Sequence, residues 1–200
     1  MSLDLKIEQV KQYPTKDGEV TEILLKDKVY PFEIKQYYKA YQGTDIISTW
    51  IEIMNNGKKS VTLYRFVSAY LPVQRGDNWL THFHGHWGAE NMLEEEKLTN
   101  GQKVISNKDG MVNTETDNPS FMLSIDGKPQ EEYGHILGGT LAWTGNYLLK
   151  MDITNTKLNI IAGINEENSH YKLEPKETFK TPEFAMTYST SGKGLSLIHI

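Results

Sequence analysis

The sequence predicts an all-β protein, built as a large two-sheet antiparallel β-sandwich. Apolar and polar residues alternate with a period of two over residues 47–53 and again over residues 183–189, which is typical of half-buried strands. Asp-Gly or Asn-Gly pairs recur at residues 17–18, 56–57, 109–110 and 126–127, and such pairs predict tight turns. Strands separated by regular turns favour a sandwich or barrel, and the length of these strands favours two stacked sheets.

The size and composition of the chain indicate one globular domain. It has 200 residues, of which 38% are hydrophobic and 24% are charged, and no Pro/Gly/Ser-rich linker divides it. The formal net charge is −5 without a basic stripe, which argues against nucleic acid as a partner. Cysteine is absent, so disulfides, thiolate catalysis and zinc–thiolate sites are excluded.

Neither a membrane nor a secretory route is indicated by the sequence. No apolar run is long enough to span a bilayer, and the first residues, MSLDLKIEQV, lack the apolar core of a signal peptide. We therefore expect a cytoplasmic protein with no membrane partner.

Two segments in the middle of the chain are harder to assign. VTLYRFVSAYLPV, residues 61–73, is apolar or aromatic on both faces, which predicts a strand buried on two sides. ENMLEEEKL, residues 90–98, is the one candidate helix. Its consecutive glutamates fit either a solvated helix face or an edge strand whose charge opposes aggregation.

Three alternating histidines, His82, His84 and His86, form the first candidate site. On a strand they share one face, where with Glu90 they could bind zinc. The alternative is that they line a half-buried face and contact their neighbours. The glycines that flank Trp87 indicate a turn that interrupts this face, so we predict no bound metal and no cofactor.

Acidic and aromatic residues are the other candidates. Glycoside hydrolysis needs two carboxyl groups on opposite sides of the scissile bond, but no spacing singles out a pair among Glu90, Asp109, Glu115, Asp117 and Glu174. No nucleophile motif or phosphate-binding loop is present. Trp79 and Trp87 lie in turn-like contexts and could stack on sugars, although most aromatic residues of a sandwich pack in its core.

Five segments, in order, resemble the N-terminal domain of family 36 glycoside hydrolases, the bacterial α-galactosidases. They are IEIMNNGKKSVTLYRFVSAYLPV, GHWGAE, SNKDGMVNTETDNPSFML, GGTLAWTGNYLLKMD and INEENSHYKLEPKETFKTPEFAMTYSTSGKGL. The matching positions are Trp87, Glu90, Asn118, Pro119, Phe121, Gly145, Asn146, Leu173, Glu174, Pro175, Glu177, Thr181, Pro182 and Glu183. The departures are Lys176, where the family usually has glycine, and residues around Val112 and Asn113, where it has a serine pair.

The resemblance implies a β-supersandwich, a fold also found in aldose mutarotases. Residues 1–193 would form this accessory domain without the family's first strands, and residues 194–200 would begin the linker helix toward a (β/α)8 catalytic barrel. The parent enzyme would hydrolyse terminal α-galactosides with retention, using barrel carboxylates that this chain lacks. The chain would then have no catalytic residue of its own, and would support the barrel, the pocket rim and the contacts of a homo-oligomer.

Four residues are the expected contacts with carbohydrate at that rim: Trp87, Glu90, Asn118 and Trp79. At the turn, Trp87 and Glu90 are also expected to pack and hydrogen-bond, so that loss of the Trp87 indole would destabilise the fold. Two alternatives remain open. One is a mutarotase-like epimerase in which the three histidines and Glu90 exchange the anomeric proton of the sugar. The other is a carbohydrate-binding module that uses Trp79 or Trp87.

Overall fold

The computed structural model describes residues 3–110, 117–167 and 169–194, which form sixteen β-strands. The first eight are β1 (Leu5–Thr15), β2 (Gly18–Asp27), β3 (Phe32–Tyr41), β4 (Ile46–Asn55), β5 (Val61–Leu63), β6 (Ala69–Gln74), β7 (Trp79–His86) and β8 (Ala89–Lys97). The second eight are β9 (Gly101–Asn107), β10 (Asp117–Ser124), β11 (Ile136–Leu141), β12 (Tyr147–Ile153), β13 (Lys157–Ile164), β14 (Tyr171–Leu173), β15 (Thr178–Lys180) and β16 (Phe184–Ser189). The linker helix expected over 194–200 falls almost wholly outside the described residues.

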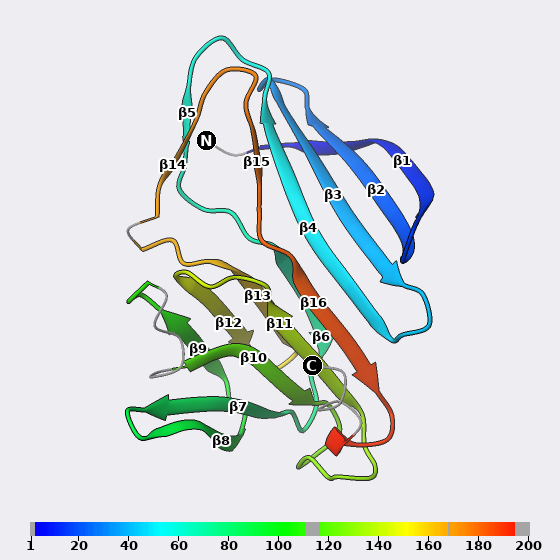
Figure 1. The fold of residues 1–200 in the computed structure, drawn as a ribbon, viewed down its shortest axis with the longest axis vertical. Helices are drawn as coiled ribbons and strands as arrows, with labels where there is room; N and C mark the ends of the chain where they lie inside the picture. The colour runs from blue at the N-terminus through cyan, green and yellow to red at the C-terminus, as the bar shows by residue number, and fades with distance from the viewer. Residues whose placement is uncertain (1–2, 111–116, 168, 195–200) are drawn as a thin grey trace.

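A ten-stranded antiparallel sheet forms the main layer of the molecule (Figure 1). Its strand order is β1-β2-β3-β4-β16-β11-β10-β7-β8, and β15 pairs with β4 beside this path. A second sheet of four strands, in the order β6-β13-β12-β9, and a two-stranded sheet of β14 and β5 lie against it. This arrangement confirms the predicted all-β antiparallel sandwich.

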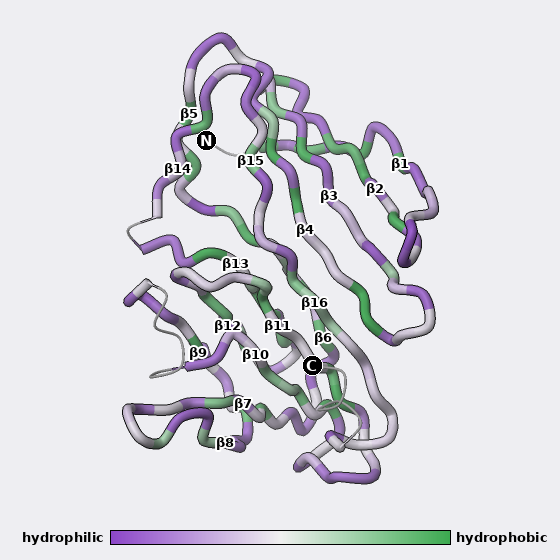
Figure 2. The backbone as a smooth tube through the Cα atoms, viewed as in Figure 1, coloured by the Kyte–Doolittle hydropathy of each residue, from purple (hydrophilic) through white to green (hydrophobic). Residues whose placement is uncertain are grey.

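The main core lies between the four-stranded sheet and the β16-β11-β10-β7 part of the large sheet. Leu80, Phe121, Leu149, Leu158 and Phe184 are buried there and represent both layers. Figure 2 shows the corresponding concentration of hydrophobic segments along β10 to β13. A smaller cluster lies under the two-stranded sheet, and its buried members are Phe32, Ile53 and Leu173. Because the second layer is short, much of the β1–β3 region is left partly exposed.

Close aromatic packing explains why β11 carries a glycine at position 139. Gly139 lies opposite Phe121 on one side and opposite Met186 on the other. The rings of Phe121 and Phe184 stack with their centroids 6.3 Å apart over this position. A Cβ atom at Gly139 would be 2.6 Å from Cζ of Phe184 and 2.8 Å from the Phe121 ring.

The two alternating segments found in the sequence pair with one another. They form β4 and β16, with Ile47 opposite Met186 and Thr49 opposite Phe184. This confirms the strands predicted from residues 47–53 and 183–189.

Residues 61–73, by contrast, do not form one strand buried on both sides. The segment splits into β5, which pairs with β14, and β6, which pairs with β13. Tyr64 is 63% exposed and Tyr70 is 58% exposed. The apolar residues that suggested two buried faces therefore belong to strands of two different sheets. An irregular segment connects these two strands.

Residues 90–98 form an edge strand, not a helix. They are included largely in β8, which pairs only with β7 at the end of the large sheet, and Figure 2 shows it as predominantly hydrophilic. Glu95 forms a 2.8 Å ion pair with Lys193, and Glu96 contacts Lys103. Of the two interpretations of this segment, the charged edge strand is the one observed.

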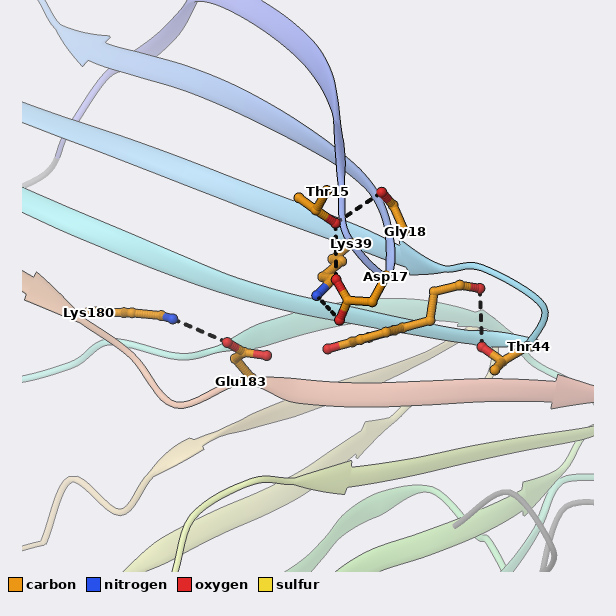
Figure 3. A network of polar contacts seen from close by, with 8 residues as sticks. Thr15, Asp17, Gly18, Lys39, Thr44, Lys180 and Glu183 are labelled. Carbon is orange, nitrogen blue, oxygen red and sulfur yellow. Dashed lines mark hydrogen bonds and ion pairs between the residues drawn. The ribbon is translucent and has the colours of Figure 1, made fainter.

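The predicted turn at Asp17-Gly18 joins β1 and β2. Thr15 pairs with Gly18, and the Thr15 hydroxyl donates to the Gly18 carbonyl at 2.9 Å. The Asp17 carboxylate accepts a 2.7 Å bond from Nζ of Lys39 on β3 (Figure 3). The Lys39 ammonium lowers the pKa of Asp17, and this pair ties the turn to the next strand.

Candidate functional site

The β7–β8 hairpin carries most of the residues that the sequence singles out. His86 pairs with Ala89, so Trp87 and Gly88 form the turn, and Gly88 has φ of +80°. The register shifts between His84 and His86, because Gly85 alone faces Glu90 and Asn91, so the extra residue of a β-bulge lies on β8 opposite Gly85. A Cβ atom at Gly85 would lie 3.0 Å from the backbone of the facing strand, so the bulge needs glycine there.

The three histidines alternate as predicted, but they do not share one environment. His82 is 3% exposed and lies opposite Phe121 of β10, beneath the second sheet. His84 and His86, farther along the strand toward the turn, are exposed. The second sheet therefore covers only the first of the three positions.

Partly exposed charged side chains surround the buried His82. Its Nε2 is 3.4 Å from Oε1 of Glu96 and 3.6 Å from Oε2 of Glu94, while neither ring nitrogen makes a hydrogen bond to the residues that the structure describes. Burial lowers the pKa of His82, as does nearby Lys103, and the facing carboxylates of Glu94, Glu96 and Asp117 only partly oppose this. His82 is therefore neutral at neutral pH, and these contacts are close approaches of a neutral ring to carboxylates, not ion pairs.

Within the described ranges, no three histidine, aspartate or glutamate side chains are arranged to hold a metal ion. The zinc site that the three alternating histidines could have formed with Glu90 is not assembled in this geometry.

Three of the four expected carbohydrate contacts lie at one edge of the large sheet. Trp87 and Glu90 are at the β7–β8 turn. Asn118 follows Asp117, which pairs with His84 near that turn. Trp79 begins β7, opposite Ser124, and Lys128 lies 5.8 Å from the centre of its ring. Since the ends of this eight-residue strand are roughly 23 Å apart, Trp79 does not belong to the same site.

Trp87 does not pack or hydrogen-bond as expected. Its side chain is 84% exposed, the largest value among the exposed large hydrophobic residues of the described part of the chain. Glu90 is also exposed. The turn projects from the sandwich (left edge of Figure 1), so Trp87 has no core to pack against.

A network of asparagines fixes the neighbouring loops at this edge. Asn165 is 2% exposed, and its Nδ2 donates to the carbonyl of Asn107 at 3.2 Å. The Nδ2 of Asn107 donates to the Gly110 carbonyl at 2.7 Å, and the Gly110 amide donates to Oδ1 of Asn146 at 2.7 Å. The loops that follow β9, β11 and β13 are thereby held together.

Sequence reasoning missed Trp143, which extends this edge. It follows β11 and is 40% exposed. If Gly145 carried a Cβ atom, that atom would lie 2.8 Å from Nε1 of Trp143. The glycine therefore leaves room for the indole. The Gly145-Asn146 pair was visible in the sequence and marked the loop, but only the fold shows that Trp143 lies on the same edge as the hairpin turn.

The acidic candidates lie in two different parts of the fold. Glu174 follows β14 in the two-stranded sheet, where its carboxylate is 2.6 Å from Nζ of Lys172, whereas Glu90 lies on β8 at the other end of the view (Figure 1). Asp109 belongs to the loop after β9, and Asp117 lies opposite His84. Glu115 is outside the described residues. The edge of the large sheet that carries the β7–β8 turn presents aromatic and amide groups suited to contact a polyhydroxylated ligand.

The comparisons with known proteins agree with one another on a single family. The model of the glycosyl hydrolase family 36 N-terminal domain matches residues 1–174. The chain is 27% identical over 177 residues to alpha-galactosidase AgaA of Geobacillus stearothermophilus, covering 88% of this chain and 24% of that protein. It is 29% identical over 171 residues to alpha-galactosidase Mel36A of Lactobacillus acidophilus, covering 85% of this chain and 23% of that protein.

Solved structures agree with these matches. A crystal structure of AgaA in complex with raffinose superposes with a TM-score of 0.91 at 25% identity, covering 98% of this chain and 29% of that one. The chain therefore spans about a quarter of the length of the curated relatives that it matches.

Proposed function

The chain belongs to the glycosyl hydrolase family 36 N-terminal domain family, and from this we propose that it is the non-catalytic β-sandwich of an α-galactosidase-like enzyme. One observation carries the proposal. The family match extends over residues 1–174, whereas the relatives that are named as alpha-galactosidases are about four times as long. The chemistry would then belong to the rest of the parent protein, which we propose to be a retaining hydrolase of terminal α-galactosides.

The β7–β8 turn would supply part of the substrate rim in that parent. Its exposed indole at Trp87 offers an apolar face to sugar C–H groups. Glu90 at the same turn and Asn118 on the neighbouring strand β10 would offer hydrogen-bonding groups. The two-residue turn of Trp87 and Gly88, in which Gly88 has φ of +80°, holds the indole away from the sandwich. The relatives solved with raffinose and stachyose support a carbohydrate as the ligand class.

The remaining partners follow from the same proposal. A (β/α)8 barrel of the same polypeptide would pack against this domain, and the assembled enzyme would be a homo-oligomer. A cytoplasmic location is also proposed, and fractionation of cells that express the parent would test it. In the described residues, no helix is long and apolar enough to cross a membrane.

Two assays of the purified chain test the proposal. With a nitrophenyl α-galactoside we expect no turnover, because the family match is to an N-terminal domain and the relatives named as alpha-galactosidases are about four times as long. Polarimetry of freshly dissolved α-galactose tests the epimerase alternative, and we expect no acceleration. Turnover in either assay that survives a control for host enzymes would refute the accessory role.

A chimera tests the rim. Residues 1–193 would replace the homologous segment of AgaA, and kinetics with raffinose would compare Trp87→Ala with Tyr70→Ala, an exposed aromatic residue on β6 that is remote from the turn. We expect Trp87→Ala to impair raffinose hydrolysis and Tyr70→Ala to leave it unchanged. Equal kinetics of both variants and the unmodified chimera would exclude Trp87 from the rim.

A further inference from the structure

A cavity lies at the other end of the sandwich from the β7–β8 turn. Its volume is about 420 Å³, within the range of small-molecule sites. Its lining comes from the end of β6, the end of β10, the start of β11 and the end of β16, namely Gln74, Gly76, Ile125, Asp126, His135 and Tyr188. Trp79, at the start of β7, marks the same end of the large sheet.

A fully buried asparagine fixes one wall of this cavity. The Oδ1 of Asn78 accepts bonds from the Gly76 amide at 2.9 Å and from the Arg75 guanidinium at 3.0 Å. Its Nδ2 donates to the carbonyls of Gln74 at 3.4 Å and Ile125 at 3.3 Å. Asn78 therefore joins the β6 side of the cavity to the β10 side.

Hydrogen bonds of the segment between β10 and β11 fix the opposite wall of the cavity. The Asp126 carboxylate accepts a 3.2 Å bond from the backbone amide of His135. Beyond this loop, the amides of Gly192, Lys193 and Gly194 donate to the carbonyls of Gly134, Gln130 and Glu131 at 3.1, 2.9 and 3.1 Å. Both walls are therefore ordered without a ligand, which reduces the entropy cost of binding one.

The groups left open toward the cavity are those that recognise a neutral sugar. The Tyr188 ring is 48% exposed, and its hydroxyl is hydrogen-bonded to Nδ1 of His135. One Asp126 oxygen and the Gln74 side-chain amide make no hydrogen bond in the described part of the chain, so an acceptor and a mixed donor–acceptor remain available.

The charges disfavour an anionic ligand. No lysine or arginine is among the lining residues, and Asp126 would repel a phosphate or carboxylate. The nearby Arg75 guanidinium is already committed to the carbonyls of Thr154 and Leu98 at 3.3 Å each and to Asn78. An aromatic face beside a carboxylate and an amide suits a ring with an apolar C–H face and adjacent hydroxyls.

We propose that this cavity, formed by Gln74, Gly76, Ile125, Asp126, His135 and Tyr188, binds one neutral saccharide unit. The site is separate from the β7–β8 turn and does not rest on the proposed role of that turn. A chain with no catalytic function could still hold carbohydrate here.

Amide-resolved NMR titration of the chain with galactose, raffinose and glucose 6-phosphate tests this site. We expect saturable shifts at Asp126, His135 and the residues next to Tyr188 with a neutral sugar, and weaker or no binding of the phosphate. Tyr188→Ala, which removes the stacking face, should weaken neutral-sugar binding about tenfold, equivalent to about 1.4 kcal/mol. Asp126→Asn keeps the oxygen that accepts from His135 and should also weaken binding.

Tyr70→Ala is the matched control, since Tyr70 is 58% exposed and does not line the cavity. It should bind like the unmodified chain. Thermal unfolding of every variant, including the milder Tyr188→Phe, separates lost binding from lost folding. The proposal is wrong if no saturable shift appears in the cavity residues, or if glucose 6-phosphate binds more tightly than the neutral sugars. It is also wrong if Asp126→Asn and a folded Tyr188 variant bind the neutral sugars normally while Trp87→Ala abolishes that binding.

Discussion

The Nε2 atom of His82 lies 3.4 Å from Oε1 of Glu96, across the pair of strands β7 and β8. The imidazole is 3% exposed, and neither of its nitrogens has a hydrogen-bond partner within residues 3–110, 117–167 and 169–194. Glu96 also contacts Lys103 of β9, and its carboxylate only partly compensates a charge on the ring. Protonation of His82 would therefore place a cation inside the sandwich.

This arrangement predicts acid sensitivity of the fold. Burial lowers the pKa of His82 below its ordinary value of 6.5, so the unfolded chain binds this proton more readily than the folded chain. The stabilisation is full above about pH 6.5 and is lost as the pH falls from there through the lowered pKa. Thermal unfolding between pH 7.5 and pH 4.5 should show that His82→Gln flattens the decline in this window.

His86→Gln is the control for that experiment, because His86 is on the same strand and exposed. It should follow the pH profile of the unmodified chain. A profile of His82→Gln that is parallel to the unmodified profile over the whole range would contradict the assignment.

Gly139→Ala should destabilise the sandwich. The new methyl group would meet Phe184 at 2.6 Å and Phe121 at 2.8 Å, and both rings are fully packed in the core. Overpacking of this kind typically costs about 1–3 kcal/mol in the free energy of unfolding, measured by urea denaturation.

The double variant Gly139→Ala with Phe184→Leu is the internal check. The smaller side chain makes room for the methyl group, so the double variant should lose less stability than the sum of the single variants. Strict additivity would show that the clash with Phe184 is not the cause.

The fold class could be predicted because alternation is a local property. β4 and β16 were found from the alternation over residues 47–53 and 183–189, although burial follows this alternation only in part. Ile47 and Tyr188 are exposed, whereas Ser48 and Thr187 are buried. Residues 61–73 were misassigned because apolarity on both faces does not reveal that β5 and β6 belong to different sheets. That information lies in their partners β14 and β13, which are about a hundred residues away in the chain.

The candidate site was only partly predictable for a related reason. The alternation of His82, His84 and His86 placed them on one face, but where the second sheet ends decides that only His82 is buried. Trp87 and Trp79 looked equivalent in the sequence, yet they stand at opposite ends of one strand. The cavity around Tyr188 is formed by segments that are far apart in the sequence, and the place of Trp143 at the edge also depends on distant strands. No short sequence pattern predicts either of them.

Asn165→Ala should loosen the loops that border the hairpin edge. Its loss removes the 3.2 Å bond to the Asn107 carbonyl and the 3.0 Å bond accepted from the Glu167 amide, inside a site that is 2% exposed. Leaving buried groups unpaired costs about 1–3 kcal/mol each. Hydrogen exchange should rise at Glu167 and in the neighbouring loops.

Asn100→Ala, at an exposed position, is the control and should be nearly neutral, because surface substitutions usually change stability by less than about 0.5 kcal/mol. If Asn165→Ala were as mild as Asn100→Ala, the asparagine network would not be what holds these loops.

Trp87→Ala should leave the stability of the chain nearly unchanged, in contrast to what its glycine-flanked position in the sequence suggested. The indole is 84% exposed, so its removal creates no cavity, and the free energy of unfolding should change by no more than about 0.5 kcal/mol. Leu80→Ala, at a fully buried position on the same strand, should cost about 2–5 kcal/mol. Urea denaturation of both variants compares the two sites directly. A loss with Trp87→Ala as large as with Leu80→Ala would mean that the indole packs against the protein in solution, and the turn could then not present it to a carbohydrate.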